Sequence, residues 1–224
     1  MPDPQPIGAP VTLSLPRPRP PRTPMQGQYG SVIPTTPEHA AALHAAFVAD
    51  TEARDWTYLP YGPFASEPAF AEWLTTACLA EDPLFHTICA PDGTALGLAS
   101  YLRIDPANGV IEVGHIHFAP ALQRTPLATE AMALMMARAF DELGYRRYEW
   151  KCDALNAPSR RAAQRLGFTY EGTFRQATVV KGRNRDTAWF SVLDTEWPAI
   201  KARFSAWLEP GNFDASGRQI TPLR

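Results

Sequence analysis

Glu112 is the best candidate in this sequence for a proton acceptor, because it stands in an otherwise apolar stretch, IEVGHIHF (111–118). Burial raises the pKa of a carboxyl group, and such a carboxylate can accept a proton from an attacking nucleophile, directly or through a water molecule. The other interpretation is a structural glutamate paired with an arginine such as Arg103. We take Glu112 as the candidate general base and keep the ion pair as its alternative.

His115 and His117 follow in the same stretch and share one face of the expected strand, since they are two residues apart. They could act as a base or bind a metal ion. No third ligand accompanies them, so we expect packed or surface histidines and no metal site.

The turn Gln123–Ala128 has the residues and the position of an anion site. It joins an expected strand to an expected helix, and the start of a helix offers free N–H groups and a positive dipole end to a diphosphate. Pro126 donates no hydrogen bond, but proline is tolerated in the first helical turn. Arg124 and the Thr125 hydroxyl can bind phosphate instead. The alternative is a strand–helix connection with no ligand.

Periodicity and turn residues predict the elements that position these groups. The expected strands are 29–33, 84–90, 95–104, 110–118, 147–153, 168–180 and 186–193. The expected helices are 37–50, 66–81, 128–143, 158–166 and 195–208. This order predicts an α+β (mixed α/β) domain in which an antiparallel meander is followed by one right-handed strand–helix–strand crossover.

Two segments of the chain resemble the motifs of the GNAT acetyltransferase superfamily. The segment 111–116 with the helix opening at 123–131 is similar to the acetyl-CoA motif, and Asn156-Ala157-Pro158-Ser159, Gly167-Phe168 and Glu171-Gly172 resemble the second motif, N-x-x-S…GF…EG. The likeness covers roughly residues 27–195 and is strongest to the RimJ and RimL branch of ribosomal-protein N-terminal acetyltransferases. It implies a GNAT fold, whose central, mostly antiparallel twisted sheet is flanked by helices.

The resemblance also implies which residues meet acetyl-CoA. Ser159 would be catalytic and assist departure of the thiolate, because the tyrosine that many members carry four residues later is Ala163 here. Helix capping is the plain alternative for Asn156 and Ser159, and it is compatible with cofactor contact. Pro126 replaces the central glycine of the family loop Q/R-x-x-G-x-G/A. The expected cofactor-binding residues are Ile116, His117, Phe118, Gln123, Arg124, Thr125, Leu127, Ala128, Asn156 and Ser159.

The acceptor site is expected to lie between an aromatic loop, 56–64, and the charged segment 181–186. We expect Trp56, Tyr58, Tyr61, Arg185 and Asp186 to bind the acceptor. The alternatives are that the aromatic rings fill the core and that the charges belong to an ordinary hairpin turn.

These observations predict an acetyl-CoA-dependent N-acetyltransferase that acts on a primary amine by direct transfer in a ternary complex. The amine could belong to a protein N-terminus, an aminoacyl compound or a small molecule. A non-catalytic GNAT-like binding module is the alternative, supported by Pro126 and Ala163. Acetyl-CoA and the amine acceptor are the expected partners, and a homodimer stays open.

Composition sets the remaining limits. The formal net charge is −2 and 45% of the 224 residues are hydrophobic, so no nucleic-acid or membrane partner is expected. Cys78, Cys89 and Cys152 are sparse and fit buried thiols in a cytoplasmic protein. We expect an extended proline-rich arm over 1–26, the acetyltransferase domain over 27–208 and a polar tail over 209–224.

Overall fold

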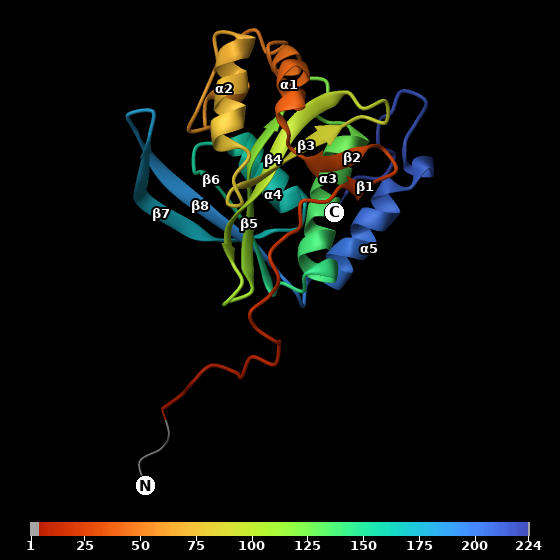
Figure 1. The fold of residues 1–224 in the computed structure, drawn as a ribbon. Coiled ribbons are helices and arrows are strands. Elements are labelled where there is room, and N and C mark those ends of the chain that lie inside the picture. Colours follow the sequence, from red (N-terminus) through yellow and green to blue (C-terminus); the bar gives the residue numbers. More distant parts are fainter. Residues whose placement is uncertain (1–4, 224) are drawn as a thin grey trace.

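A twisted sheet of eight strands in the order β1-β2-β3-β4-β5-β6-β8-β7 organises the chain (Figure 1). The computed structural model describes residues 5–223, so residues 1–4 of the predicted arm and the last residue of the predicted tail lie outside the described part. The strands are β1 (Met25–Gln26), β2 (Ser31–Pro34), β3 (Leu84–Cys89), β4 (Ala95–Asp105), β5 (Val110–Phe118), β6 (Arg147–Asp153), β7 (Thr169–Val180) and β8 (Arg183–Leu193). Only β5 and β6 are described as a parallel pair, which confirms the predicted mostly antiparallel sheet.

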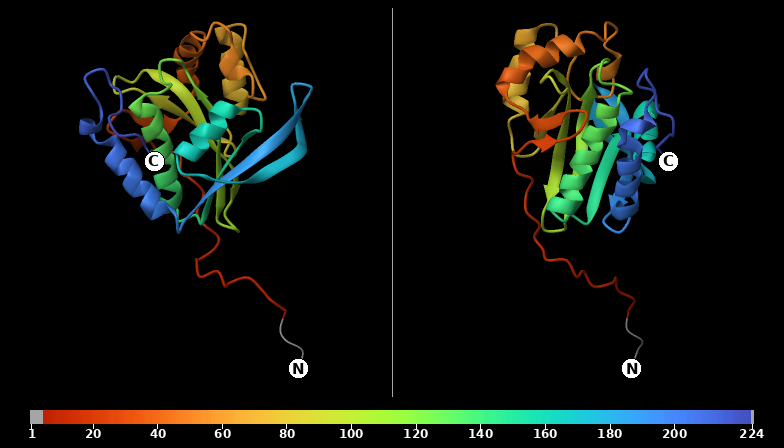
Figure 2. Two further views of the ribbon diagram at one scale, coloured as in Figure 1. Left: turned by 180° about the vertical axis from the view of Figure 1, so that it is seen from behind. Right: turned by 90° about the vertical axis from the view of Figure 1, so that its right-hand side faces the viewer.

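Helices cover both faces of this sheet (Figure 2). They are α1 (Ala40–Phe47), α2 (Glu67–Ala77), α3 (Pro126–Ala137), α4 (Ala157–Arg165) and α5 (Trp197–Leu208). Helices α3 and α5 pack on one face in the larger core, and α1 and α2 form a second core against β3 and β4 on the other face. Alternate residues of β3 therefore enter different cores, with Leu84 in the first and Phe85 in the second.

Three helices end three or more residues earlier than their periodicity predicts, and the first of them, expected over 37–50, stops at Phe47. The helix expected over 66–81 stops at Ala77, and the carbonyls of Leu79 and Ala80 accept hydrogen bonds from the Arg22 guanidinium, both at 2.6 Å. The helix expected over 128–143 starts at Pro126, and its last part is a π-helical turn, Arg138–Glu142.

The proline-rich arm runs along the domain and becomes an edge strand at its end. Met25 and Gln26 pair with Val32 and Ser31 as β1, a strand that the sequence did not predict. Arg17, Arg19 and Arg22 hydrogen-bond to the domain, whereas the first described residues of the arm extend away from it (Figure 1). Arg138 fixes the junction, because its guanidinium donates to the carbonyls of Thr23 at 2.6 Å and Pro24 at 3.0 Å.

Replacing Arg138 by Met should lower the free energy of unfolding by about 2–4 kcal/mol, because the buried guanidinium satisfies two backbone carbonyls that methionine would leave without a donor. Urea unfolding followed by circular dichroism measures this loss. Arg54→Ala is the matched control: this arginine is 80% exposed and pairs with Glu52 at 3.4 Å, so its removal should change stability by less than about 0.5 kcal/mol. Equal effects of the two substitutions would contradict this account of the junction.

Candidate active site

Strands β5 and β6 separate halfway along their length. Their parallel pairing runs from Val110 opposite Arg147 to Val113 opposite Trp150, whereas β5 continues to Phe118 and β6 to Asp153. Beyond Val113 and Trp150 the facing edges of the two strands carry backbone donors and acceptors outside the described ladder. A narrow ligand with amide groups can pair with such edges.

A β-bulge opposite β4 explains the separation. Leu98 pairs with His117 and Ser100 pairs with Gly114, so His115 and Ile116 together oppose the single residue Ala99. His115 has a φ of 51°, a left-handed conformation that is uncommon for a residue other than glycine. A bulge bends its strand and increases the local twist, which turns the end of β5 away from β6.

A cavity of about 840 Å³ lies on the α3 and α4 side of this separation. Nine of the ten residues predicted to bind the cofactor line it: Ile116, His117, Phe118, Gln123, Arg124, Thr125, Ala128, Asn156 and Ser159. The tenth, Leu127, is buried, and its side chain lies against Gly30.

The α3 start is capped by its own residues. The Thr125 hydroxyl donates to the Leu122 carbonyl at 2.7 Å and accepts from the Ala128 N–H at 3.2 Å, so it serves as the helix cap. Pro126 has no N–H, and the Ala128 N–H is already bonded to Thr125. Among residues 126–128 at the start of α3, only the Leu127 N–H therefore remains for an anion. An anion bound here would therefore depend strongly on Arg124, which lines the cavity with a φ of 63°.

Ser159 lies where the large cavity meets a second one. Its N–H donates to the Asn156 side-chain oxygen at 3.1 Å, which confirms that Asn156 caps α4. Its hydroxyl oxygen accepts from the Trp150 indole N–H at 3.0 Å. Because the indole is only a donor, the serine hydroxyl keeps its own proton free for a further acceptor.

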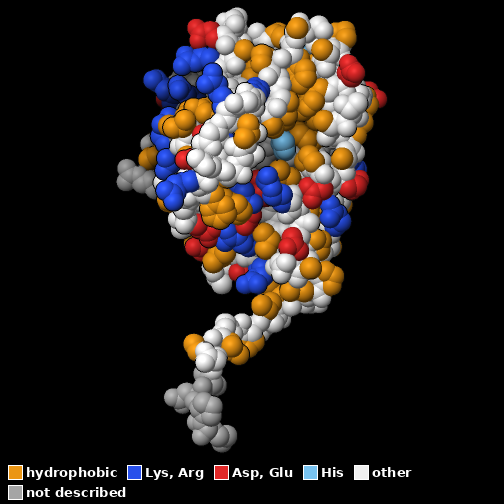
Figure 3. Space-filling model, turned by 90° about the vertical axis from the view of Figure 1, so that its left-hand side faces the viewer, with side chains coloured by type: hydrophobic (Ala, Val, Ile, Leu, Met, Phe, Trp, Pro, Cys, Tyr) orange, Lys and Arg blue, Asp and Glu red, His pale blue; other side chains and the backbone are white. Residues whose placement is uncertain are grey.

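The second cavity, of about 550 Å³, opens on the side of the β7–β8 hairpin. Figure 3 looks onto this side of the molecule, where hydrophobic side chains gather and Lys and Arg side chains cluster near the top. Its walls combine charged residues with apolar hairpin residues such as Phe174 and Val179, which are 57% and 72% exposed. Five residues line both cavities, which therefore meet at the end of the paired part of β5 and β6: Asp55, Ile116, Trp150, Asn156 and Ser159.

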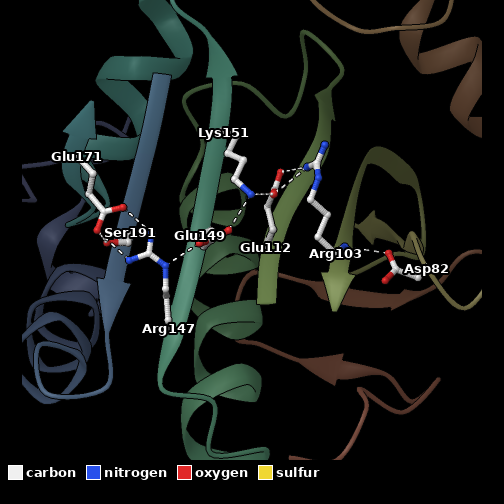
Figure 4. Close-up of polar contacts among 8 residues, drawn as sticks. All are labelled: Asp82, Arg103, Glu112, Arg147, Glu149, Lys151, Glu171 and Ser191. Carbon is white, nitrogen blue, oxygen red and sulfur yellow. Dashed lines mark hydrogen bonds and ion pairs between the residues drawn. The ribbon is translucent and has the colours of Figure 1, made fainter. Parts of the chain in front are cut away.

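Glu112 lies in the second cavity within a chain of charges that crosses the sheet (Figure 4). Its carboxylate accepts from Arg103 at 2.7 Å and from Lys151 at 2.8 Å, and it is 3% exposed. The Arg103 pair is the alternative that the sequence had offered. Lys151 also contacts Glu149 at 2.7 Å, and Glu149 contacts Arg147 at 2.6 Å.

Asp55 is a second carboxylate at the junction of the cavities, and no motif or spacing in the sequence predicts it. The Gln123 side-chain amide donates to it at 2.7 Å and to the Phe118 carbonyl at 3.0 Å. Burial, together with the nearby charge of Asp50, raises the pKa of Asp55. A raised pKa makes such a carboxylate a stronger proton acceptor than an ordinary aspartate.

The residues predicted to bind the acceptor lie in three different places. Tyr58 and Arg185 line the second cavity, and the Tyr58 hydroxyl donates to the Leu155 carbonyl at 3.2 Å. Trp56 and Tyr61 instead pack in the second core, which agrees with the alternative prediction that the aromatic rings fill the core. Asp186 accepts from the Gln176 N–H at 2.8 Å within the hairpin and lines neither cavity.

Comparisons with known proteins identify this architecture. A family model described as an acetyltransferase (GNAT) domain matches residues 32–169. The chain belongs to the GNAT acetyltransferase family. A GCN5-related N-acetyltransferase from Brucella melitensis is 48% identical, with a TM-score of 0.92 over 95% of this chain and 97% of that one.

Two further GNAT relatives carry names from the ribosomal branch. "Putative ribosomal N-acetyltransferase YdaF" of Bacillus subtilis (strain 168) is 30% identical over 49% of this chain, and the match spans 60% of that relative's length. The structure of RimL, a ribosomal L7/L12 α-N-protein acetyltransferase in complex with coenzyme A, is 19% identical with a TM-score of 0.61 and shares the fold over 75% of this chain and 95% of that one.

Burial lowers the pKa of both histidines of β5, His115 and His117. His117 is 3% exposed and stacks on Phe47, with ring centroids 3.9 Å apart, and burial lowers its pKa to about 3. Burial, aided by Arg103 and Arg185, lowers the pKa of His115 to about 4. Within residues 5–223 no group of three or more His, Cys, Asp or Glu side chains is arranged to hold a metal ion. No helix in the described part of the chain has the length and apolar character needed to cross a bilayer.

His117→Phe should make the stability of the protein less dependent on pH. The pKa of His117 is lower in the folded state than in the unfolded state, so its contribution is complete above about pH 6.5 and is lost as the pH falls toward 3. Between pH 7 and pH 5 the unmodified protein should lose about 2 kcal/mol more of its free energy of unfolding than the variant does, measured by urea unfolding. The same pH dependence in both proteins would show that His117 is not buried as a neutral ring.

Proposed function

We propose that this protein is an acetyl-CoA-dependent N-acetyltransferase that transfers the acetyl group directly to a primary amine in a ternary complex. The observation that carries the proposal is the meeting of two cavities at Ser159, beside the point where β5 and β6 separate. One cavity can hold the thioester donor and the other the amine, and their common wall would place the two reacting groups side by side. A protein N-terminus, an aminoacyl compound or a small amine fits this chemistry, and the names of the relatives favour the first.

The large cavity fits the shape and charge of acetyl-CoA. Its diphosphate would lie at the α3 start beside Arg124, its pantetheine arm along Ile116–Phe118, and its carbonyl oxygen near backbone donors around His117. The nine predicted residues that line this cavity support the placement. Loss of the usual loop glycine to Pro126 shifts the binding of phosphate from backbone N–H groups toward arginine side chains.

Glu112 is the proposed proton acceptor for the amine, acting through water. Both of its oxygens accept hydrogen bonds from cations, so the carboxylate is held in place and a proton would reach it from a bridging water rather than by direct contact. The raised pKa and the position of Asp55 make that residue the second candidate for the same role.

Direct transfer needs no intermediate in which the acetyl group is bound to the protein. The amine nitrogen forms the new bond to the acetyl carbon, the carbon–sulfur bond breaks, and the Ser159 hydroxyl donates a hydrogen bond to the departing thiolate. Cys152 lines the acceptor cavity, but burial raises the pKa of its thiol. A protonated thiol is a weak nucleophile, and this supports direct transfer over an acetyl-cysteine intermediate.

Glu112→Gln should lower kcat about 100-fold, measured as CoA release with a saturating amine. Glu149→Gln is the matched control, because Glu149 also pairs with Lys151 but lines neither cavity. Both variants should lose stability, whereas only the first should lose turnover. Full activity of Glu112→Gln together with a large loss in Asp55→Asn would move the role of proton acceptor to Asp55.

Ser159→Ala should lower kcat by about 10- to 100-fold, with little change in the affinity for acetyl-CoA, because the hydroxyl is needed mainly as negative charge develops on sulfur. Trp150→Phe keeps the hydroxyl and removes only its indole donor, so we expect a smaller loss from it. Isothermal titration with acetyl-CoA distinguishes this enzyme from a non-catalytic binding module, the alternative that Pro126 suggests. Failure to bind acetyl-CoA would contradict the proposed function.

A further inference from the structure

We propose that the C-terminal segment, residues 209–223, forms with α4 and α5 a subsite for the nucleotide end of acetyl-CoA, in which arginines bind the 3′-phosphate and Trp207 lies beside the adenine ring. This inference rests on the proposed function. The segment lies beyond residue 169, where the match to the family model ends, so it is a feature that the family assignment does not supply.

The C-terminal segment is held on the domain by its own hydrogen bonds. The Trp207 indole N–H donates to the Gln219 side-chain oxygen at 2.9 Å, and the Asn212 side chain bonds to both the N–H and the carbonyl of Thr221. Phe213 packs edge-on against Trp207, with ring centroids 5.0 Å apart. The polar tail predicted over 209–224 contributes Phe213, Gly217, Arg218 and Gln219 to the wall of the large cavity.

The C-terminal segment lines one end of the large cavity. Trp207, Phe213, Gly217, Arg218 and Gln219 line this cavity and not the acceptor cavity. The reacting end of the cavity is where it meets the acceptor cavity, at Ser159. The C-terminal segment therefore lies at the end away from the chemistry, where the nucleotide half of a long thioester donor would extend.

The charged residues that line the large cavity are mostly arginines. Arg124, Arg165 and Arg218 line it, whereas Asp55 is the one carboxylate among its lining residues and stands at the reacting end. Arg165 donates to the Thr129 hydroxyl at 3.1 Å, and its guanidinium lies 4.8 Å from the centre of the Trp207 ring. Arg218 is 82% exposed and pairs with Asp214 at 3.5 Å, so it is free to turn toward a ligand.

Coenzyme A carries two separate anionic groups, and the α3 start accounts for only one of them. The diphosphate would use Arg124, which leaves Arg165 and Arg218 for the 3′-phosphate. Guanidinium groups suit phosphate oxygens because they donate several hydrogen bonds in one plane. An arginine stacked on an indole also provides a flat surface for an adenine base.

The test compares three donors by isothermal titration at one fixed salt concentration: acetyl-CoA, acetyl-3′-dephospho-CoA and S-acetyl-phosphopantetheine. The full chain should bind acetyl-CoA roughly ten-fold more tightly than the dephospho analogue, and the dephospho analogue more tightly than the pantetheine fragment. Arg218→Ala should weaken acetyl-CoA roughly ten-fold and leave the other two donors unchanged. Arg218→Lys should restore part of the loss, and Arg175→Ala, an exposed arginine that lines neither cavity, should change nothing.

The outcomes separate this inference from the proposed function. If the full chain binds all three donors equally, or if Arg218→Ala weakens all three by the same factor, the nucleotide subsite is wrong while acetyl-CoA binding stands. If the full chain binds none of the three, the proposed function fails and the subsite fails with it.

Discussion

The limited pairing between β5 and β6 is the constraint on which the site depends. Five residues of β5 continue past Val113, and the bulge at His115 and Ile116 turns them away from β6. A parallel pair extended to its full length would satisfy more backbone groups, but it would close the passage between the two cavities. The unpaired strand edges leave backbone groups with which a ligand can form hydrogen bonds. The first residues of α3 and α4 line the same cavity.

Charged residues hold the sheet together on the side where the strands stay paired. The chain from Arg103 through Glu112, Lys151 and Glu149 to Arg147 links β4, β5 and β6, and Arg147 continues it to Glu171 of β7, whose pKa it lowers (Figure 4). Burying so many charges is costly unless each has a partner, and here each buried carboxylate meets two cations. The same network holds Glu112 in the wall of the second cavity, so the proposed proton transfer would use contacts that also stabilise the sheet.

Local patterns in the sequence predict most of the fold. The alternation around Tyr148 and Trp150 predicts β6 with its bounds, and Pro158 with Gly167 brackets α4. The limit of the β5–β6 pairing depends on contacts between distant residues, and no local pattern reports it. The aromatic loop shows the same limit: its rings suit a binding wall and a core equally well, and only tertiary packing places Trp56 and Tyr61 in the core. Asp55 and the C-terminal segment line the large cavity beside residues far away in the sequence, which no local pattern reports.

The most direct test of the central claim is a crystal structure of the full chain with a non-hydrolysable acetyl-CoA analogue. The account predicts a pantetheine arm in the large cavity, hydrogen-bonded to the free edge of β5 along Ile116–Phe118, with its thioester position beside Ser159. Side chains of the protein filling that space, with the analogue absent or bound elsewhere, would contradict it.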